Sequence, residues 1–154
     1  MTIKEAERTY RLPNPTTAED LETRWSKVLN FDGETGPYAQ YTHARCCSVL
    51  RKAGEYDRAN MDAAALTDAA SAALIKAIDA LPDAVKLAAE KNEPYVVARA
   101  AMEICTAYNK FYFDNKIMVD DIAVRNARLA LTDAARIAIK QGLYLVGLEA
   151  PERM

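Results

Sequence analysis

The chain has 154 residues, enough for one domain with its own core, and its 51% apolar and 27% charged residues are ordinary for a soluble globular protein. No apolar run approaches the roughly 18 residues that a membrane span needs, and the polar N-terminus is not a signal peptide, so we expect a cytoplasmic protein with no membrane partner. The net charge of −2 excludes a global attraction to nucleic acid, so any RNA site must be local.

The first part of the chain predicts a leader followed by a helix. Residues 1–15 have mixed charge, two prolines and no sustained period. The segment Thr16-Thr17-Ala18-Glu19 is a capping box, and apolar residues follow it at helical spacing as far as Leu29. Residues 30–36 contain two glycines and two acids, which is typical of a loop.

The rest of the chain predicts further helices, separated by prolines, glycines and capping residues. The predicted helices run from Pro37 until Gly54 ends the helix, from Asp62 to Ala80, from Pro82 to about Glu90, from Pro94 to Tyr112, and from Asp120 or Asp121 until Gly142 ends the helix. The apolar segment 143–148 is too short for an independent helix, and we expect it to fold back. Strand signals are nearly absent, so the fold class is an all-α, compact bundle of five to six helices.

Catalytic and metal-binding patterns are missing. The single histidine, His43, excludes a multi-histidine metal site, and no glycine-rich phosphate loop or nucleophile elbow is present. His43 with Cys46 or Cys47 suggests a nucleophilic pair, but no third orienting group accompanies it, and a polar histidine on a helix face is the simpler interpretation. The three cysteines are expected to be reduced, small, partly buried side chains. We assign no catalytic residue and no metal ligand.

Positive charge and tyrosines are unevenly distributed. Residues 36–53 contain Arg45, Arg51 and Lys52 and no acid, and residues 124–144 contain four basic residues against one acid. Tyrosines lie one helical turn apart in two places, Tyr38 with Tyr41 and Tyr108 with Tyr112. Such patterns suit an RNA face with stacked bases, but a solvated helix face and core rings explain them equally well.

Three blocks lie in order along the chain: FDGETGPYAQYTHARCCSVLRK from Phe31, YNKFY from Tyr108 with Asn115 after it, and ARLALTDAARIAIKQGLYLVGLEAPERM from Ala127 to Met154. Together they resemble the C-terminal anticodon-binding domain of class I arginyl-tRNA synthetases, whose chains also end in Glu-Arg-Met. The resemblance covers residues 27–154 and assigns them to a helical anticodon-binding domain. Residues 1–26 do not match and are assigned to an N-terminal leader or linker helix.

The resemblance implies a bundle that binds the anticodon loop of tRNA(Arg) and reads its middle cytosine from bases splayed out of their stack. Apolar contacts are implied for Tyr38 or Tyr41, for Tyr108 and for Met154, without fixing which of Tyr38 and Tyr41 is the closer match. The polar residues implied around them are Gln40, Arg45 and Asn109, while Arg128 is expected either to meet a phosphate or to brace the terminal segment. The C-terminus is expected to be pinned against the bundle.

The catalytic signatures of the same family, His-Ile-Gly-His and Lys-Met-Ser-Lys-Ser, have no counterpart in the sequence. The resemblance therefore implies that ATP and Mg are bound only by a catalytic domain outside this chain, which is a partner alongside tRNA(Arg). Both an excised domain and a standalone relative fit the sequence. A tRNA-binding regulatory domain and a helical protein-interaction module remain the alternative functions.

Overall fold

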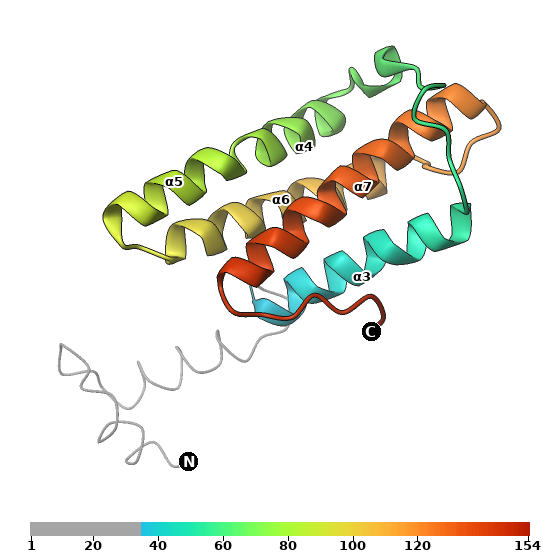
Figure 1. The fold of residues 1–154 in the computed structure, drawn as a ribbon. Coiled ribbons are helices and arrows are strands. Elements are labelled where there is room, and N and C mark those ends of the chain that lie inside the picture. Colours follow the sequence, from blue (N-terminus) through green and yellow to red (C-terminus); the bar gives the residue numbers. More distant parts are fainter. Residues whose placement is uncertain (1–34) are drawn as a thin grey trace, which may run out of the picture. The chain divides into compact units, whose positions relative to one another are not determined.

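The computed structural model describes residues 35–154 (Figure 1). The part of the chain described is helical and contains no strand. Its elements are α3 (Gly36–Ala53), the 3-10 helix η1 (Ala63–Leu66), α4 (Ala69–Asp79), α5 (Leu81–Lys91), α6 (Tyr95–Asp114) and α7 (Ile122–Leu145). The all-α prediction is confirmed. The leader 1–26, the helix predicted within the first 29 residues and the boundary at residue 27 lie outside the described residues.

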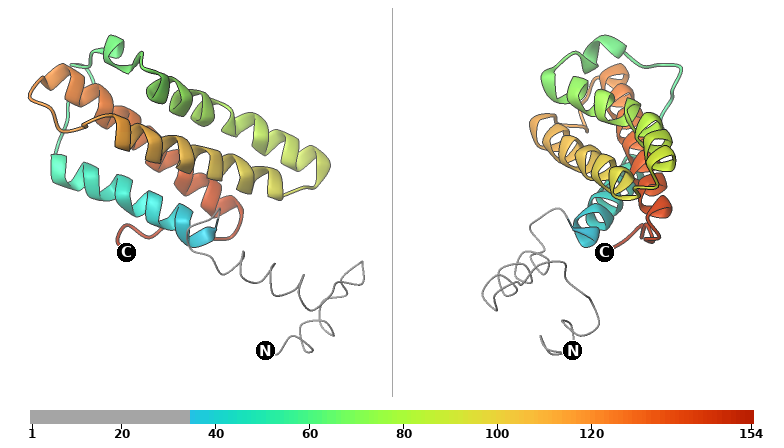
Figure 2. Two further views of the ribbon diagram at one scale, coloured as in Figure 1. Left: turned by 180° about the vertical axis from the view of Figure 1, so that it is seen from behind. Right: turned by 90° about the vertical axis from the view of Figure 1, so that its left-hand side faces the viewer.

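Helix α6 lies at the centre of the bundle. It packs against α3, α4, α5 and α7, and α4 and α5 follow one another along its side (Figures 1 and 2). Ile104, Tyr108 and Phe111 of α6 have no exposed surface, and Leu74 of α4 and Ile139 of α7 are equally buried against them. Burial of such side chains from every helix of the bundle is the main stabilising contribution to this fold.

Several predicted helix ends are confirmed. Gly54 follows α3 with a φ of +72°, a backbone conformation that favours glycine. Pro82 lies in the first turn of α5, where its missing N–H is not needed. The Asp121 carboxylate caps α7 by accepting hydrogen bonds from the N–H groups of Ala123 and Val124.

The helix predicted from Asp62 to Ala80 is in fact two elements. Asp62 accepts a hydrogen bond from Ala64 and caps η1, and Asp68 accepts hydrogen bonds from Ala70 and Ser71 and caps α4. An aspartate that caps a helix has extended backbone, so Asp68 cannot continue a helix through its own position. The apolar period runs on across this break, which is why the sequence pattern does not reveal it.

The predicted end of the last helix at Gly142 is wrong. Helix α7 continues to Leu145, and Gly147, with a φ of +77°, follows its end. Gly142 is needed for packing instead, because a Cβ at this position would lie 2.7 Å from the Cβ of Ala101 on α6. Leu143 is buried within α7, while Leu148 reaches back to the start of α3, close to Gly36.

No helix within residues 35–154 is long and apolar enough to cross a membrane.

Candidate functional site

The C-terminal tail after α7 is held across α3 by two hydrogen bonds. The side-chain amide of Gln40 donates to the carbonyl of Glu149 at 2.9 Å, and Nδ1 of His43 lies 2.9 Å from the carbonyl of Pro151. A carbonyl can only accept, so Nδ1 of His43 carries the proton of this bond. His43 is buried rather than on a polar helix face as predicted, and burial lowers its pKa. The expected pinning of the terminus against the bundle is thus present in the structure.

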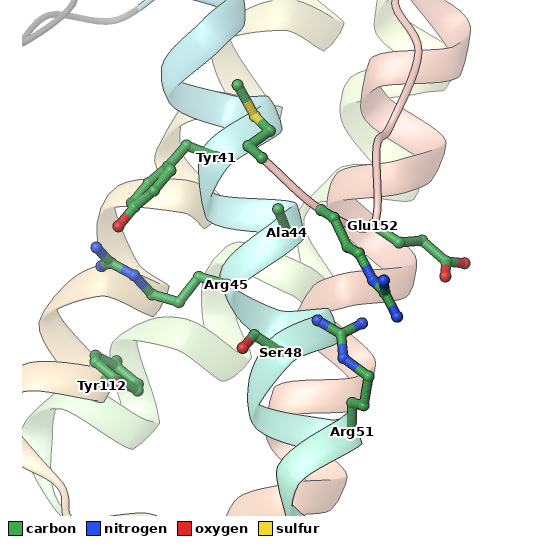
Figure 3. Close-up of a pocket in the computed structure, with 9 residues that line it drawn as sticks. Tyr41, Ala44, Arg45, Ser48, Arg51, Tyr112 and Glu152 are labelled. Carbon is green, nitrogen blue, oxygen red and sulfur yellow. The ribbon is translucent and has the colours of Figure 1, made fainter.

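The end of the tail lines an open pocket of about 460 Å³ on the surface of α3. The pocket combines residues of α3, α6 and the tail, as Figure 3 shows. Its lining consists of Tyr41, Ala44, Arg45, Ser48, Arg51, Tyr112, Glu152, Arg153 and Met154. The structure therefore brings together three of the predicted residues, Tyr41, Arg45 and Met154, from opposite ends of the described chain.

Arg45 lies between two exposed tyrosines. Its guanidinium carbon is 4.8 Å from the ring centroid of Tyr41 and 5.3 Å from that of Tyr112, distances at which a cation interacts with an aromatic ring. Tyr41 is 50% exposed and Tyr112 is 42% exposed, so both rings still offer surface to a ligand. Hydrogen bonding to Arg45 and the charge of its guanidinium lower the pKa of Tyr41.

Asn109 holds Arg45 in place. Its Oδ1 accepts a 2.6 Å hydrogen bond from Arg45, and its Nδ2 lies within hydrogen-bond distance of the Tyr38 hydroxyl (2.9 Å) and the Thr42 hydroxyl (3.2 Å). Tyr38 is partly buried against the core, and neither it nor Asn109 lines the pocket. Of the two tyrosines left open by the sequence, Tyr41 is the one in the pocket. Asn109 and Tyr38 brace the site from behind.

Tyr108 is not at the surface. Its ring has no exposed area and packs in the core beside Phe111, so it offers no face on which a base can stack. Tyr112, one turn further along α6, occupies the pocket instead. Both tyrosines belong to the YNKFY block, and their spacing of four residues places them on the same side of a helix, so the sequence does not separate them.

Arg128 also lies outside the pocket. It donates a 2.7 Å hydrogen bond to the carbonyl of Lys116, in the loop between α6 and α7, and its Nε is buried without a hydrogen-bond partner among the described residues. Arg128 therefore braces that loop and not the terminal segment, while a phosphate contact stays a prediction.

The pocket is cationic although the chain has a net charge of −2. Among the described residues, Arg45, Arg51 and Arg153 line it, against one carboxylate side chain, that of Glu152. The Glu152 side chain points away from Tyr41 and Arg45 in Figure 3. The pocket thus offers ring faces, hydrogen-bond donors and positive charge, the combination that suits a nucleotide.

The candidate Cys–His pair does not form a nucleophilic centre. The Cys47 sulfur lies 3.8 Å from Nε2 of His43, but both residues are buried and Nδ1 of His43 is already bonded to the tail. Burial raises the pKa of Cys47, and it raises those of Cys46 and Cys105 to about 12, so the reactive thiolate is disfavoured in each. All three cysteines are unpaired and buried, as predicted. Within residues 35–154 no group of three or more His, Cys, Asp or Glu side chains is arranged to hold a metal ion.

Residues 39–154 match the family described as the DALR anticodon binding domain. The arginine–tRNA ligase of Clostridioides difficile (strain 630) is 46% identical over 136 residues, which are 88% of this chain and 24% of that protein. The arginine–tRNA ligase of Halothermothrix orenii is 43% identical with the same coverage. The chain therefore spans about a quarter of the length of the curated relatives that it matches.

Two solved structures have the same fold. The arginyl-tRNA synthetase of Thermus thermophilus has a TM-score of 0.76 at 33% identity, covering 84% of this chain and 23% of that one. The arginyl-tRNA synthetase of Plasmodium falciparum has a TM-score of 0.72 with the same coverage, and at 22% identity it supports the fold alone.

Proposed function

Because the chain belongs to the DALR anticodon-binding domain family, we propose that it binds the anticodon loop of tRNA(Arg) as a domain of an arginine–tRNA ligase. Its contribution is to select and position the tRNA in the cytoplasm. Attachment of arginine, with the ATP and Mg that this reaction uses, belongs to a catalytic domain outside this chain. The relatives, about four times as long as the matched segment, support this division of labour.

The pocket between Tyr41, Tyr112 and Met154 is the observation on which this function rests. Bases of a tRNA loop can leave their stack, and an exposed tyrosine ring contributes roughly 1–3 kcal/mol when a base stacks on it. Arg45 lies between the rings, so its remaining N–H groups are available to acceptor atoms on the edge of that base. A cytosine has two such acceptors, its ring N3 and its O2. Arg51 and Arg153 supply charge for the adjoining phosphates.

A fluorescence anisotropy titration with two anticodon stem-loops tests the specificity. One stem-loop has the tRNA(Arg) sequence, and in the other the middle cytosine is replaced by uracil. We expect the cytosine form to bind about tenfold more tightly or better, because a well-placed hydrogen-bonding pair discriminates bases by about 1–3 kcal/mol. Equal affinities for the two stem-loops would show that the pocket does not read this base.

Two variants test the pocket itself. Tyr41→Ala and Tyr112→Ala should each weaken binding of the cytosine stem-loop by about 1–3 kcal/mol while the helical circular dichroism signal stays at the wild-type level. Tyr95→Ala is the matched control, since Tyr95 lies at the opposite end of α6 from Tyr112 and is 63% exposed. If the control weakens binding as much as the two pocket variants, the RNA is bound elsewhere.

A further inference from the structure

A second pocket adjoins the first along α3. It has a volume of about 410 Å³ and lies between the C-terminal half of α3 and the loop that follows α6. Its lining consists of Arg45, Ser48, Val49, Lys52, Tyr112, Asn115, Lys116, Ile117 and Met118. Arg45, Ser48 and Tyr112 line both pockets, so the two cavities share one wall.

The chemistry of the second pocket matches that of the first. Within the described part of the chain, three cationic side chains line it, Arg45, Lys52 and Lys116, and no carboxylate does. Apolar surface comes from Val49, Ile117 and Met118, the last of which is 42% exposed. A volume of this size is within the range of pockets that bind small organic groups. Apolar surface with cations around it suits a base and its phosphate.

The loop that forms one wall of this pocket is held in place by hydrogen bonds to Asp68, α6 and α7. The Asn115 side chain is buried and donates a 3.2 Å hydrogen bond to Asp68, and its backbone N–H donates to Phe111 at 2.9 Å. Arg128 donates a hydrogen bond to the carbonyl of Lys116, and the Ile117 side chain is only 5% exposed. Because the wall is formed before any ligand arrives, binding there does not require ordering of the loop.

We propose that the second pocket binds one of the two nucleotides next to the nucleotide held by the first pocket. The base lies against Met118 and Val49, and the two phosphates that flank this nucleotide lie one near Lys52 and the other near Lys116. Arg45 and Tyr112 separate the two bases. This inference rests on the proposed function, since it extends the same RNA site by one nucleotide.

The salt dependence of binding tests the two lysines. In the double variant Lys52→Ala, Lys116→Ala, the slope of log K against log salt should become shallower by about 1.4, because each lost phosphate contact of a single strand contributes about 0.7. The control is Lys76→Ala, Lys91→Ala, whose lysines lie on α4 and α5 and line neither pocket. Equal slopes for the two double variants would overturn the inference.

Stem-loops with an abasic nucleotide test the base contact. We expect an abasic nucleotide on one side of the middle position to weaken binding to the wild-type chain about fivefold or more. In Met118→Ala the loss of affinity caused by the same abasic nucleotide should be smaller than in the wild-type chain. The loss caused by an abasic nucleotide on the other side of the middle position should be the same in both proteins. If neither neighbour matters to the wild-type chain, or the losses are unchanged in Met118→Ala, the second pocket is not a nucleotide site. In that case binding of the intact stem-loop leaves the proposed function standing, whereas failure to bind it would remove both proposals.

Discussion

Tyr108 and Tyr112 differ only in how the fold buries them. They lie one turn apart on α6, with ring centroids separated by 6.2 Å, yet Tyr108 has no exposed surface and Tyr112 is 42% exposed. The Tyr108 hydroxyl is buried and has no hydrogen bond of normal geometry within residues 35–154, and burial raises its pKa. A buried hydroxyl without a well-formed hydrogen bond is destabilising. Tyr108 therefore contributes to stability through its ring, and its hydroxyl adds nothing favourable.

Two substitutions separate the ring of Tyr108 from its hydroxyl. Tyr108→Ala should lower the free energy of unfolding by about 3–5 kcal/mol, because it leaves a large cavity in the core. Tyr108→Phe should be neutral or stabilising, since it removes a hydroxyl that has no well-formed hydrogen bond and keeps the ring. Urea unfolding gives both values. In anisotropy titrations Tyr108→Phe should bind the stem-loop as the wild type does, and weaker binding by this variant would return Tyr108 to the RNA site.

Asp68 is a second residue whose surroundings determine its properties. Burial raises its pKa, but hydrogen bonds from Ser71, Asn115 and Ala70 outweigh that effect and lower the pKa from 3.8 to about 2. The carboxylate caps α4 and at the same time holds Asn115 at the wall of the second pocket. Its charge therefore stabilises both a helix end and a loop.

The lowered pKa of Asp68 predicts how stability changes with pH. The unfolded state takes up the proton near pH 3.8 and the folded state only near pH 2, so the contribution of Asp68 is complete above about pH 4 and disappears as the pH falls toward 2. Asp68→Asn keeps an acceptor for the cap and cannot titrate, so its unfolding free energy should fall less steeply over this range. Urea titrations of both proteins between about pH 2 and 5 measure the difference, and parallel curves would contradict it.

Helices α6 and α7 approach one another closely at Gly142. A Cβ placed there would lie 2.7 Å from the Cβ of Ala101, and the main-chain Cα of Ala101 is 3.6 Å away. Both residues are buried, Ala101 in the first half of α6 and Gly142 in the last turn of α7. The small side chains at this crossing determine how closely the helices pack.

Gly142→Ala should therefore destabilise the bundle. Overpacking costs about 1–3 kcal/mol, which exceeds the gain of up to about 1 kcal/mol in helix propensity. Adding Ala101→Gly should relieve the clash, so the double variant should be more stable than the sum of the two single effects predicts. Strictly additive effects in thermal or urea unfolding would show that a clash with Ala101 is not what destabilises Gly142→Ala.

The C-terminal tail is the other element whose position depends on single contacts. Gln40 and His43 bind two carbonyls of the tail, those of Glu149 and Pro151. The three residues that follow Pro151 line the first pocket. In His43→Leu the Pro151 carbonyl loses its donor, so we expect the tail to detach more often and stem-loop binding to weaken about fivefold, corresponding to about 1 kcal/mol for a lost hydrogen bond.

His43→Asn is the matched control for this prediction. The Nδ2 of asparagine lies at the same number of bonds from the backbone as Nδ1 of histidine, so it can donate to the same carbonyl. Binding and the rate at which a carboxypeptidase releases Met154 should stay close to wild type in His43→Asn and change in His43→Leu. If both variants behave alike, the side-chain volume of His43 matters and its hydrogen bond does not.

At the scale of the whole molecule, the distribution of charge matters more for RNA binding than the net charge does. The chain has a net charge of −2. The two joined pockets are nevertheless lined by five cationic side chains and, among residues 35–154, by one carboxylate side chain, that of Glu152. The five cations are Arg45, Arg51, Lys52, Lys116 and Arg153. Charges farther away than the Debye length of about 8–10 Å are screened at physiological salt, so the local surplus governs binding.

The five cations set an upper limit on the salt dependence of RNA binding. If each contacts one phosphate of a single-stranded loop, log K should fall with log salt with a slope no steeper than about −3.5. Anisotropy titrations of the wild-type chain over a range of salt concentrations measure this slope. A slope near zero would exclude phosphate contacts at the pockets, and one much steeper than this limit would require a further RNA-binding face.

The sequence alone determined the helical class, most helix ends and the family resemblance. These properties depend on local signals: the Asp121 cap, Pro82 and Gly54 each act within about one turn of the backbone, and the three blocks are contiguous. The same local signals failed at Asp68 and Gly142, where a cap interrupts an apolar period and a glycine serves packing.

Only the tertiary structure decided which residues meet at the site. Arg45 and Asn109 are 64 residues apart in the chain, His43 and Pro151 are 108 apart, and Gln40 and Glu149 are 109 apart. Helix periodicity places Tyr108 and Tyr112 on one side of α6, but the helices packed around α6 determine that the first is core and the second surface. Burial depends on neighbours that are distant in sequence, and for that reason the first pocket and the second pocket beside it could not be predicted from local patterns.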